Sequence, residues 1–196
     1  MRIPMPAAVL AGGASRRMGR PKAELPYGAG TLLAFQVSRL AELFEEVLVV
    51  AKAPPASPVA PARVVLDRVP QHAAIHGLVR ALAEADDRLF VLAVDLPAIA
   101  PALLRAIAER SLATDAAALV PRADGRLQPL AAVWRRSVLA AAEGRIAAGQ
   151  MSLQGLAEEV GAEVLEEVAW RAFDPSGTAF TNLNTLEQYA AQRERA

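Results

Sequence analysis

A glycine-rich segment near the N-terminus has the composition of a phosphate-binding loop. It covers residues 10–22, reads LAGGASRRMGRPK, and follows a short apolar run. Because glycine has no Cβ, backbone N–H groups at Gly12 and Gly13 can approach phosphate oxygens closely. Arg17 and Lys22 would offset the charge of a triphosphate, the first as a planar fork and the second as a point charge. The segment therefore predicts a site for a triphosphate group.

The spacing of these glycines excludes two common nucleotide-binding motifs. It matches neither the Walker A pattern nor GxGxxG, so neither a P-loop NTPase nor a Rossmann dehydrogenase is supported. The alternative interpretation is a basic surface loop in which the glycines only allow the backbone to turn. A lone glycine pair would favour that alternative, but the whole segment favours phosphate binding.

Two aspartates follow apolar runs that we predict to be buried strands. Asp95 ends the run LFVLAV, and Asp67 comes directly after residues 64–66. An unpaired carboxylate is costly to bury at such a position. A Mg²⁺ ion with substrate phosphates would satisfy Asp95, and the alternative is that Asp95 caps the following turn. For Asp67, stabilisation of its own turn is an equal alternative.

The two histidines of the chain lie close together in the sequence. His72 and His76 are four residues apart and could share one face of a helix. Because no further ligand accompanies them, we interpret them as surface or substrate-edge residues rather than as a metal site.

Composition narrows the class of protein. The chain has 196 residues, 54% of them hydrophobic, which suits a single domain over residues 1–196. Its 21 basic and 21 acidic residues balance, which argues against binding to nucleic acid or to a membrane surface. It has no cysteine, which excludes disulfides, thiolate metal sites and a thiol nucleophile. The apolar start is too short for a signal peptide, and Asp95 and Pro97 interrupt the most apolar region, so we expect a soluble cytoplasmic protein.

Short apolar runs alternate with longer helical patterns, which is typical of an α/β fold with a mostly parallel sheet between two helical layers. The proline-rich segment 51–62 is interpreted as a surface loop. Because the glycine-rich segment and both aspartates follow predicted strands, they should meet at the carboxyl edge of the sheet, where ligands bind. Strands are predicted at residues 7–11, 47–51, 64–66, 89–94, 117–120, 130–133 and 162–168, and helices at 31–44, 75–84, 101–109, 137–148, 152–160 and from 185 onward.

Taken in order, these segments resemble the MobA family of molybdenum cofactor guanylyltransferases. The family pattern LAGGxSxRMGxxK is met without a gap by residues 10–22. Asp67 resembles the aspartate of the family's second motif, and Asp95-Leu96-Pro97 resembles its DxP motif. Residues 125–130 resemble a later turn and strand, and residues 180–185 resemble the ending FxNxNTPE. This terminal element points to the guanylyl branch, whereas the first motif is shared with cytidylyltransferases.

The resemblance implies a Rossmann-like, three-layer αβα domain of the nucleotide-diphospho-sugar-transferase type. It implies transfer of GMP from GTP to the terminal phosphate of molybdopterin, with Mg²⁺ as cofactor and pyrophosphate as leaving group. The implied protein partners are enzymes of molybdenum cofactor biosynthesis or enzymes that accept the cofactor.

The resemblance also implies roles for particular residues. Lys22, Arg17 and Asp95 would support the transfer, and Asp95 would hold Mg²⁺. Asn182 and Asn184 would face the pterin. The residues implied to line the nucleotide site are Leu10, Ala11, Gly12, Gly13, Gly19, Lys22, Asp67, Gly77 and Asp95.

Two departures from the family pattern leave alternatives open. Where the family has PGPLxG, this chain has residues 72–77, which read HAAIHG and keep only Gly77. The polar residue that often follows the second strand is replaced by Val50-Ala51-Lys52, which would remove one base or ribose contact. The alternatives are a cytidylyltransferase or other transferase that uses a different phosphorylated acceptor, and a nucleotide-binding module without activity.

Overall fold

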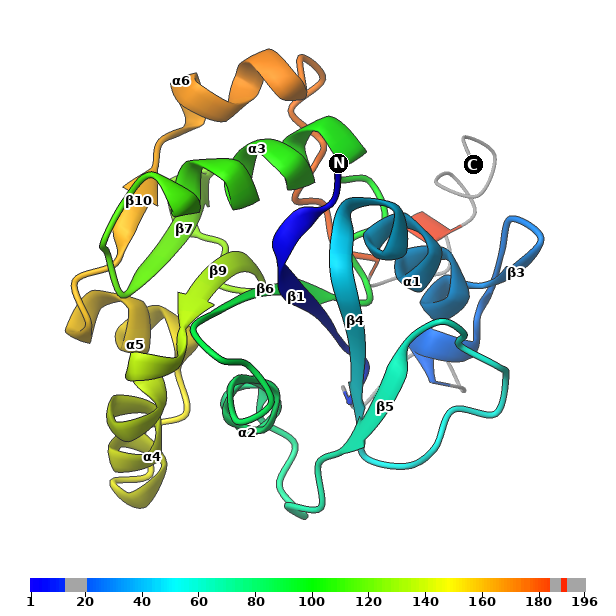
Figure 1. The fold of residues 1–196 in the computed structure, drawn as a ribbon, viewed down its shortest axis with the longest axis horizontal. Helices are drawn as coiled ribbons and strands as arrows, with labels where there is room; N and C mark the ends of the chain where they lie inside the picture. Colours follow the sequence, from blue (N-terminus) through cyan, green and yellow to red (C-terminus); the bar gives the residue numbers. More distant parts are fainter. Residues whose placement is uncertain (13–20, 184–187, 190–196) are drawn as a thin grey trace.

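The computed structural model describes residues 1–12, 21–183 and 188–189 of the chain. In this part, a central β-sheet lies between two layers of helices (Figure 1). The α-helices are α1 (Leu32–Leu43), α2 (Ala74–Leu82), α3 (Pro101–Leu112), α4 (Leu139–Ala147), α5 (Leu153–Glu159) and α6 (Glu167–Trp170), and the 3₁₀ helices are η1 (Lys22–Glu24), η2 (Arg136–Val138) and η3 (Arg171–Phe173). The strands are β1 (Ile3–Leu10), β2 (Pro26–Tyr27), β3 (Gly30–Thr31), β4 (Phe44–Ala51), β5 (Arg63–Leu66), β6 (Arg88–Ala93), β7 (Ala118–Ala123), β8 (Arg126–Leu127), β9 (Ala131–Arg135) and β10 (Glu163–Leu165).

The strands of the main sheet run mostly in one direction. Their order is β10-β7-β9-β6-β1-β4-β5, and β8 pairs with β7. Strand β1 is parallel to both β4 and β6, β5 is parallel to β4, and β10 is parallel to β7. Strands β8 and β9 are antiparallel to their neighbours. The α/β class and the mostly parallel sheet predicted from the sequence are therefore confirmed.

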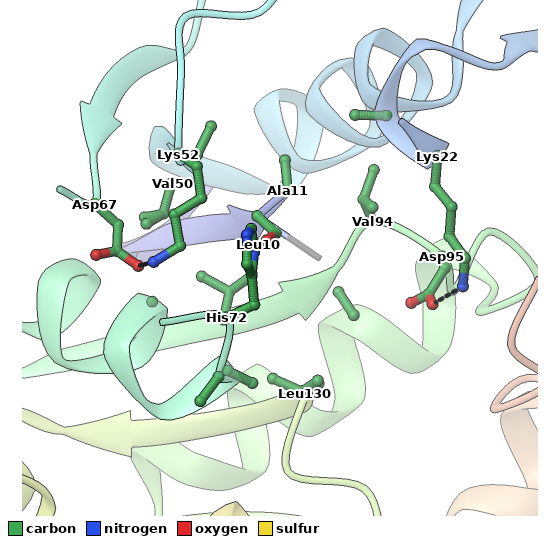
Figure 2. A pocket seen from close by; sticks show the side chains of 17 residues that line it. Leu10, Ala11, Lys22, Val50, Lys52, Asp67, His72, Val94, Asp95 and Leu130 are labelled. Carbon is green, nitrogen blue, oxygen red and sulfur yellow. Dashed lines mark hydrogen bonds and ion pairs between the residues drawn. The ribbon is translucent and has the colours of Figure 1, made fainter. Parts of the chain in front are cut away.

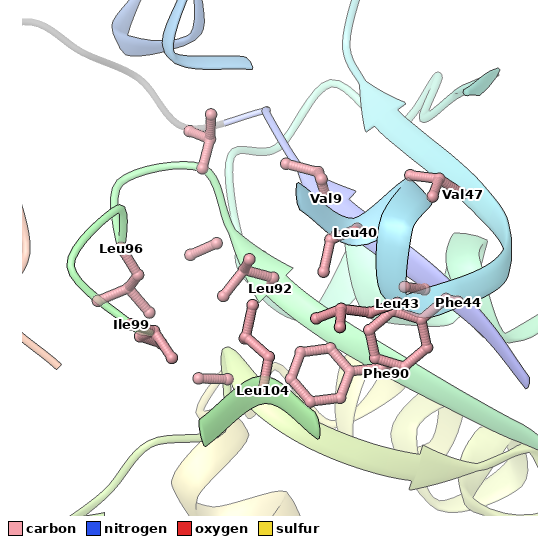
Figure 3. Close-up of a cluster of buried hydrophobic side chains, with 14 of the residues drawn as sticks. Val9, Leu40, Leu43, Phe44, Val47, Phe90, Leu92, Leu96, Ile99 and Leu104 are labelled. Atoms are coloured by element: carbon pink, nitrogen blue, oxygen red, sulfur yellow. The ribbon is translucent and has the colours of Figure 1, made fainter. Parts of the chain in front are cut away.

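Both faces of the sheet are covered, which explains why its central strands are continuous apolar runs. On one face, α1 and α3 pack on a core in which the rings of Phe44 and Phe90 lie 5.1 Å apart (Figure 3). On the other face, α2, α4 and α5 enclose a second core that includes Leu48, Val91 and Trp134. The two cores hold the ends of β1, β4 and β6 in fixed positions.

Helix α1 returns the chain across the sheet, so that β4 runs parallel to β1. It begins after Thr31, whose hydroxyl accepts a hydrogen bond from the backbone N–H of Ala34 at 3.1 Å. This contact satisfies one of the N–H groups that a helix start leaves without a partner. The helix ends directly at Phe44, the first residue of β4. The crossover connection predicted between residues 31 and 51 is therefore present without an intervening loop.

Some predicted boundaries were wrong near the C-terminus. The strand expected over residues 162–168 ends at Leu165, and residues 167–170 form the short helix α6 instead. The helix expected from residue 185 onward lies almost wholly outside the described residues. Among the helices that the structure describes, none has the length and apolar character needed to cross a membrane.

Candidate functional site

A pocket of about 420 Å³ opens where β1, β4 and β6 end (Figure 2). From β1 the chain adds β4 and β5 on one side, and α2 then carries it back to β6 on the other side. Open α/β sheets bind ligands at such a reversal of strand order. Seven of the predicted site residues line this pocket: Leu10, Ala11, Gly12, Lys22, Asp67, Gly77 and Asp95.

One end of the pocket carries an ion pair between Lys22 and Asp95. The Lys22 Nζ atom lies 2.7 Å from Asp95 Oδ2, although the two residues are 73 positions apart. Lys22 opens η1, and Asp95 lies just beyond the end of β6. Their side chains are 18% and 21% exposed, so a ligand in the pocket can reach both. The sequence predicted both residues for the same site, and the fold brings them together.

The turn that carries Asp95 is held from two sides by backbone contacts. From α1, the Gln36 side chain donates a hydrogen bond to the carbonyl of Val94 at 3.2 Å. From the C-terminal segment, the N–H of Leu183 donates to the carbonyl of Asp95 itself at 3.0 Å. These contacts fix the backbone beside the carboxylate and therefore limit where that carboxylate can point.

Arg39 of α1 holds the next part of the same turn. Its guanidinium donates to the carbonyl of Pro97 at 2.5 Å and to the carbonyl of Ile99, and it lies over the ring of Phe35. Burial lowers the pKa of Arg39 to about 10, while the nearby Tyr27 acts in the opposite direction. A poorly solvated cation gains most from the carbonyl dipoles around it. Arg39 is therefore a structural cross-link between α1 and the turn after β6.

Replacement of Arg39 by methionine should destabilise the protein. The change keeps the apolar contact with Phe35 but leaves the carbonyls of Pro97 and Ile99 without their donor. We expect the free energy of unfolding to fall by about 2 kcal/mol, as measured by urea denaturation. Arg105→Met is the matched control, because Arg105 is an exposed residue of α3 paired with Glu109. An equal loss in both variants would contradict the cross-link.

The opposite wall of the pocket carries a second ion pair, between Lys52 and Asp67. Lys52 Nζ lies 2.6 Å from Asp67 Oδ2 and also donates to the carbonyls of Val69 and Gln71, at 2.6 and 2.9 Å. Asp67 is only 5% exposed. The sequence pattern at residues 50–52 predicts the loss of a polar contact, whereas the structure places Lys52 in the pocket wall. A lysine directly after a buried strand, like the aspartates after β5 and β6, was the signal that could have identified it.

His72 lies between the two ion pairs (Figure 2). Its Nδ1 atom is 3.2 Å from the carbonyl oxygen of Gly12, and the side chain is exposed to the pocket. His76, in contrast, is buried in α2 and does not line the pocket, so our expectation of a surface or substrate-edge position was wrong for it. Its position on the inner face of an amphipathic helix, beside Ile75 and Leu78, explains the burial.

One further predicted residue that the structure describes does not line the pocket. Asn182 is exposed and does not line it, although its neighbour Leu183 contacts Asp95. Four predicted residues lie outside the described part of the chain: Gly13, Arg17, Gly19 and Asn184.

The donor set of the pocket fits a metal ion that arrives with its ligand. Across residues 1–12, 21–183 and 188–189, no three acidic or histidine side chains gather as a metal site. Mg²⁺ is often held by one or two carboxylates together with water and substrate phosphates. Asp95, which is partly exposed and faced by a lysine, can supply such a carboxylate.

Comparisons with known proteins agree with this geometry. A family model described as the MobA-like NTP transferase domain matches residues 7–164. The chain is 38% identical over 193 residues to a protein of Chloroflexus aggregans named "Probable molybdenum cofactor guanylyltransferase", covering 92% of this chain and 89% of that protein. It is 31% identical over 190 residues to the molybdenum cofactor guanylyltransferase of Syntrophotalea carbinolica, covering 96% and 90%.

Solved structures share the fold. The molybdopterin-guanine dinucleotide biosynthesis protein A of Archaeoglobus fulgidus matches with a TM-score of 0.85 and 24% identity, covering 97% of this chain and 98% of that one. Rv0371c of Mycobacterium tuberculosis, solved as a complex with manganese, matches with a TM-score of 0.61 and 20% identity, covering 100% of both chains.

Proposed function

Since the chain belongs to the MobA-like NTP transferase family and is therefore a nucleotidyltransferase, we propose that it transfers GMP from GTP to the terminal phosphate of molybdopterin. The observation that carries this proposal is the Lys22–Asp95 pair at the carboxyl edge of the sheet, which lines one pocket together with Gly12. The product would pass, in the cytoplasm, to enzymes of molybdenum cofactor biosynthesis or to enzymes that accept the cofactor.

The chemistry requires positioning and charge stabilisation rather than a strong base. The attacking oxygen belongs to a phosphate that is already ionised at neutral pH. It attacks the α-phosphorus of GTP, the bond from this phosphorus to the bridging oxygen breaks, and pyrophosphate leaves. The barrier therefore comes from bringing two anions together and from the charge that develops around the α-phosphorus.

The chain supplies cations and donors where this charge develops. Lys22 neutralises Asp95 in the ligand-free chain and is placed to contact a phosphate oxygen in the complex. Gly12 exposes its backbone to the same pocket because no Cβ stands in the way. Asp95 would hold Mg²⁺, which when bound neutralises phosphate charge. The pocket walls orient the nucleotide so that its α-phosphorus faces the acceptor.

Nucleotide selectivity tests the proposal directly. A ligand that binds only the folded state at about 100 times its Kd stabilises the protein by about 2.7 kcal/mol. For a chain of this size, that corresponds to a rise in Tm of about 5–10 °C. With Mg²⁺ present, we expect GTP to give this rise and CTP and ATP to give a smaller one. A larger rise with CTP would overturn the guanylyl assignment and favour a cytidylyltransferase.

The transfer itself is tested by pyrophosphate release. We expect release with GTP and Mg²⁺ to depend on added molybdopterin. GTP binding without any release, even with molybdopterin present, would instead indicate a nucleotide-binding module without activity. A different phosphorylated acceptor would be indicated if release began only with that acceptor.

A further inference from the structure

The chain uses lysine sparingly, and both of its lysines lie in this pocket. The sequence has 21 basic residues, of which only Lys22 and Lys52 are lysines, and both line the pocket. Each forms an ion pair with an aspartate that follows a strand, Lys22 with Asp95 and Lys52 with Asp67. The first pair is part of the proposed transfer chemistry. The second pair, Lys52 with Asp67, has no role in that chemistry, so its function must be inferred from its own contacts.

The ammonium of Lys52 is fully used within the chain. It has three N–H donors, and the structure shows three acceptors: the Asp67 carboxylate at 2.6 Å, the Val69 carbonyl at 2.6 Å and the Gln71 carbonyl at 2.9 Å. The other carboxylate oxygen of Asp67 accepts the N–H of Val69 at 3.0 Å. Because a ligand could be bound only at the expense of these contacts, Lys52 is placed to organise segment 67–71 rather than to bind the nucleotide itself.

The stem of Lys52 connects this segment to the glycine-rich loop. A Cβ atom built on Gly12 would lie 3.5 Å from Lys52 Cγ, so the Lys52 stem lies beside the open face of Gly12. His72 directly follows this segment, and its Nδ1 atom lies 3.2 Å from the carbonyl oxygen of Gly12. The contacts therefore form a closed circuit from Gly12 through Lys52 and segment 67–71 to His72 and back. Four residues of this circuit line the pocket, namely Gly12, Lys52, Asp67 and His72, and the Lys52–Asp67 pair lies across the pocket from the Lys22–Asp95 pair (Figure 2).

We propose that Lys52 is a positioning residue for nucleotide binding. It holds segment 67–71, and with it the adjoining His72, beside Gly12, and so fixes one wall of the pocket. In this chain the segment leads into residues 72–77, HAAIHG, which contain no proline, and the Lys52 contacts hold the backbone just before them. The proposal rests on the proposed function for the identity of the ligand, GTP. It predicts that Lys52 determines affinity for GTP, while the transfer step at the other end of the pocket does not depend on it.

Lys52→Met tests the proposal, because it keeps the stem against Gly12 and removes only the ammonium. We expect the Kd for GTP with Mg²⁺, measured by calorimetry, and the KM for GTP to rise about tenfold or more, whereas kcat at saturating GTP stays within about twofold. Amide hydrogen exchange in residues 67–72, followed by mass spectrometry without ligand, should accelerate. Arg135→Met is the control, since Arg135 pairs with Asp87 at the opposite edge of the sheet and should change none of these values.

A second pair of variants separates positioning from simple charge neutralisation. Removal of Lys52 leaves the buried Asp67 carboxylate without its cation, so part of any loss could come from that charge alone. In the Asp67→Asn background this charge is absent, but Lys52 can still donate to Val69 and Gln71. We therefore expect Lys52→Met to weaken GTP binding further in that background. Equal GTP affinity of Asp67→Asn and of the double variant would overturn the positioning role.

The outcomes also distinguish this proposal from the proposed function. If the wild-type chain fails to bind GTP, the proposed function fails, and the exchange rates of residues 67–72 still decide whether Lys52 holds the wall. If the wild-type chain binds GTP and Lys52→Met leaves both Kd and exchange unchanged, the positioning role is overturned while the proposed function stands.

Discussion

Replacement of Asp95 by asparagine is expected to lower GMP transfer from GTP by about 10³-fold while the protein stays folded. Asparagine has nearly the same shape, so the turn that Gln36, Arg39 and Leu183 hold should keep its backbone. The side chain loses its negative charge, and with it the carboxylate proposed to hold Mg²⁺. Pyrophosphate release with GTP and molybdopterin measures the effect, and thermal unfolding shows that the fold persists.

Asp115→Asn is the matched control for this prediction. The Asp115 side chain is fully exposed and lies away from the pocket, so its replacement should leave both Tm and transfer unchanged. Near wild-type transfer by Asp95→Asn would remove the proposed metal role of this residue. Loss of transfer together with a large fall in Tm would instead assign Asp95 to stability.

The sequence could predict the two aspartates of the site because each depends on a local pattern. Asp67 and Asp95 follow apolar runs long enough to identify a buried strand, and parallel strands bring their carboxyl ends to one edge. The glycine-rich segment is likewise recognised from a short, continuous stretch of sequence. The structure accordingly places Gly12, Lys22 and Asp95 around one pocket, as expected.

Other features of the site depend on tertiary contacts that no local pattern contains. Lys52 lies at the start of a proline-rich loop, and its contact with Asp67 requires that β5 pair with β4. The contact of Leu183 with Asp95 joins residues 88 positions apart in the sequence. The burial of His76 depends on which face of α2 meets the sheet. Helix α6 has four residues, too few for a period of 3.6 residues to be recognised.

The two ion pairs of the pocket differ in how easily a ligand can break them. The side chains of Lys22 and Asp95 are 18% and 21% exposed, so solvent already weakens their attraction and can compensate for its loss. Asp67 is 6% exposed at its side chain, and breaking its pair would leave a charge with little solvent around it. A triphosphate should therefore displace Lys22 from Asp95 and leave Lys52 on Asp67. Lys22 can therefore change partners during nucleotide binding, whereas Lys52 keeps its contacts with segment 67–71.

This difference leads to a prediction for Lys22→Met. Loss of the ammonium removes a cation from the phosphate-binding end and leaves Asp95 to repel the nucleotide. We expect kcat/KM for GTP to fall by about 10²-fold or more, a loss of about 3 kcal/mol of transition-state stabilisation. Steady-state kinetics with saturating molybdopterin measures it. Arg135→Met, far from the pocket, should retain wild-type kcat/KM.

GTP binding without Mg²⁺ provides the sharpest check on Lys22, because the two residues of its ion pair should then have opposite effects. Asp95→Asn removes the negative charge that faces Lys22 and should tighten metal-free GTP binding, while Lys22→Met should weaken it. Calorimetry in the presence of a chelator measures both dissociation constants. If both variants shift metal-free affinity in the same direction, Lys22 does not pass from Asp95 to the phosphates, and the ion pair serves the fold rather than the nucleotide.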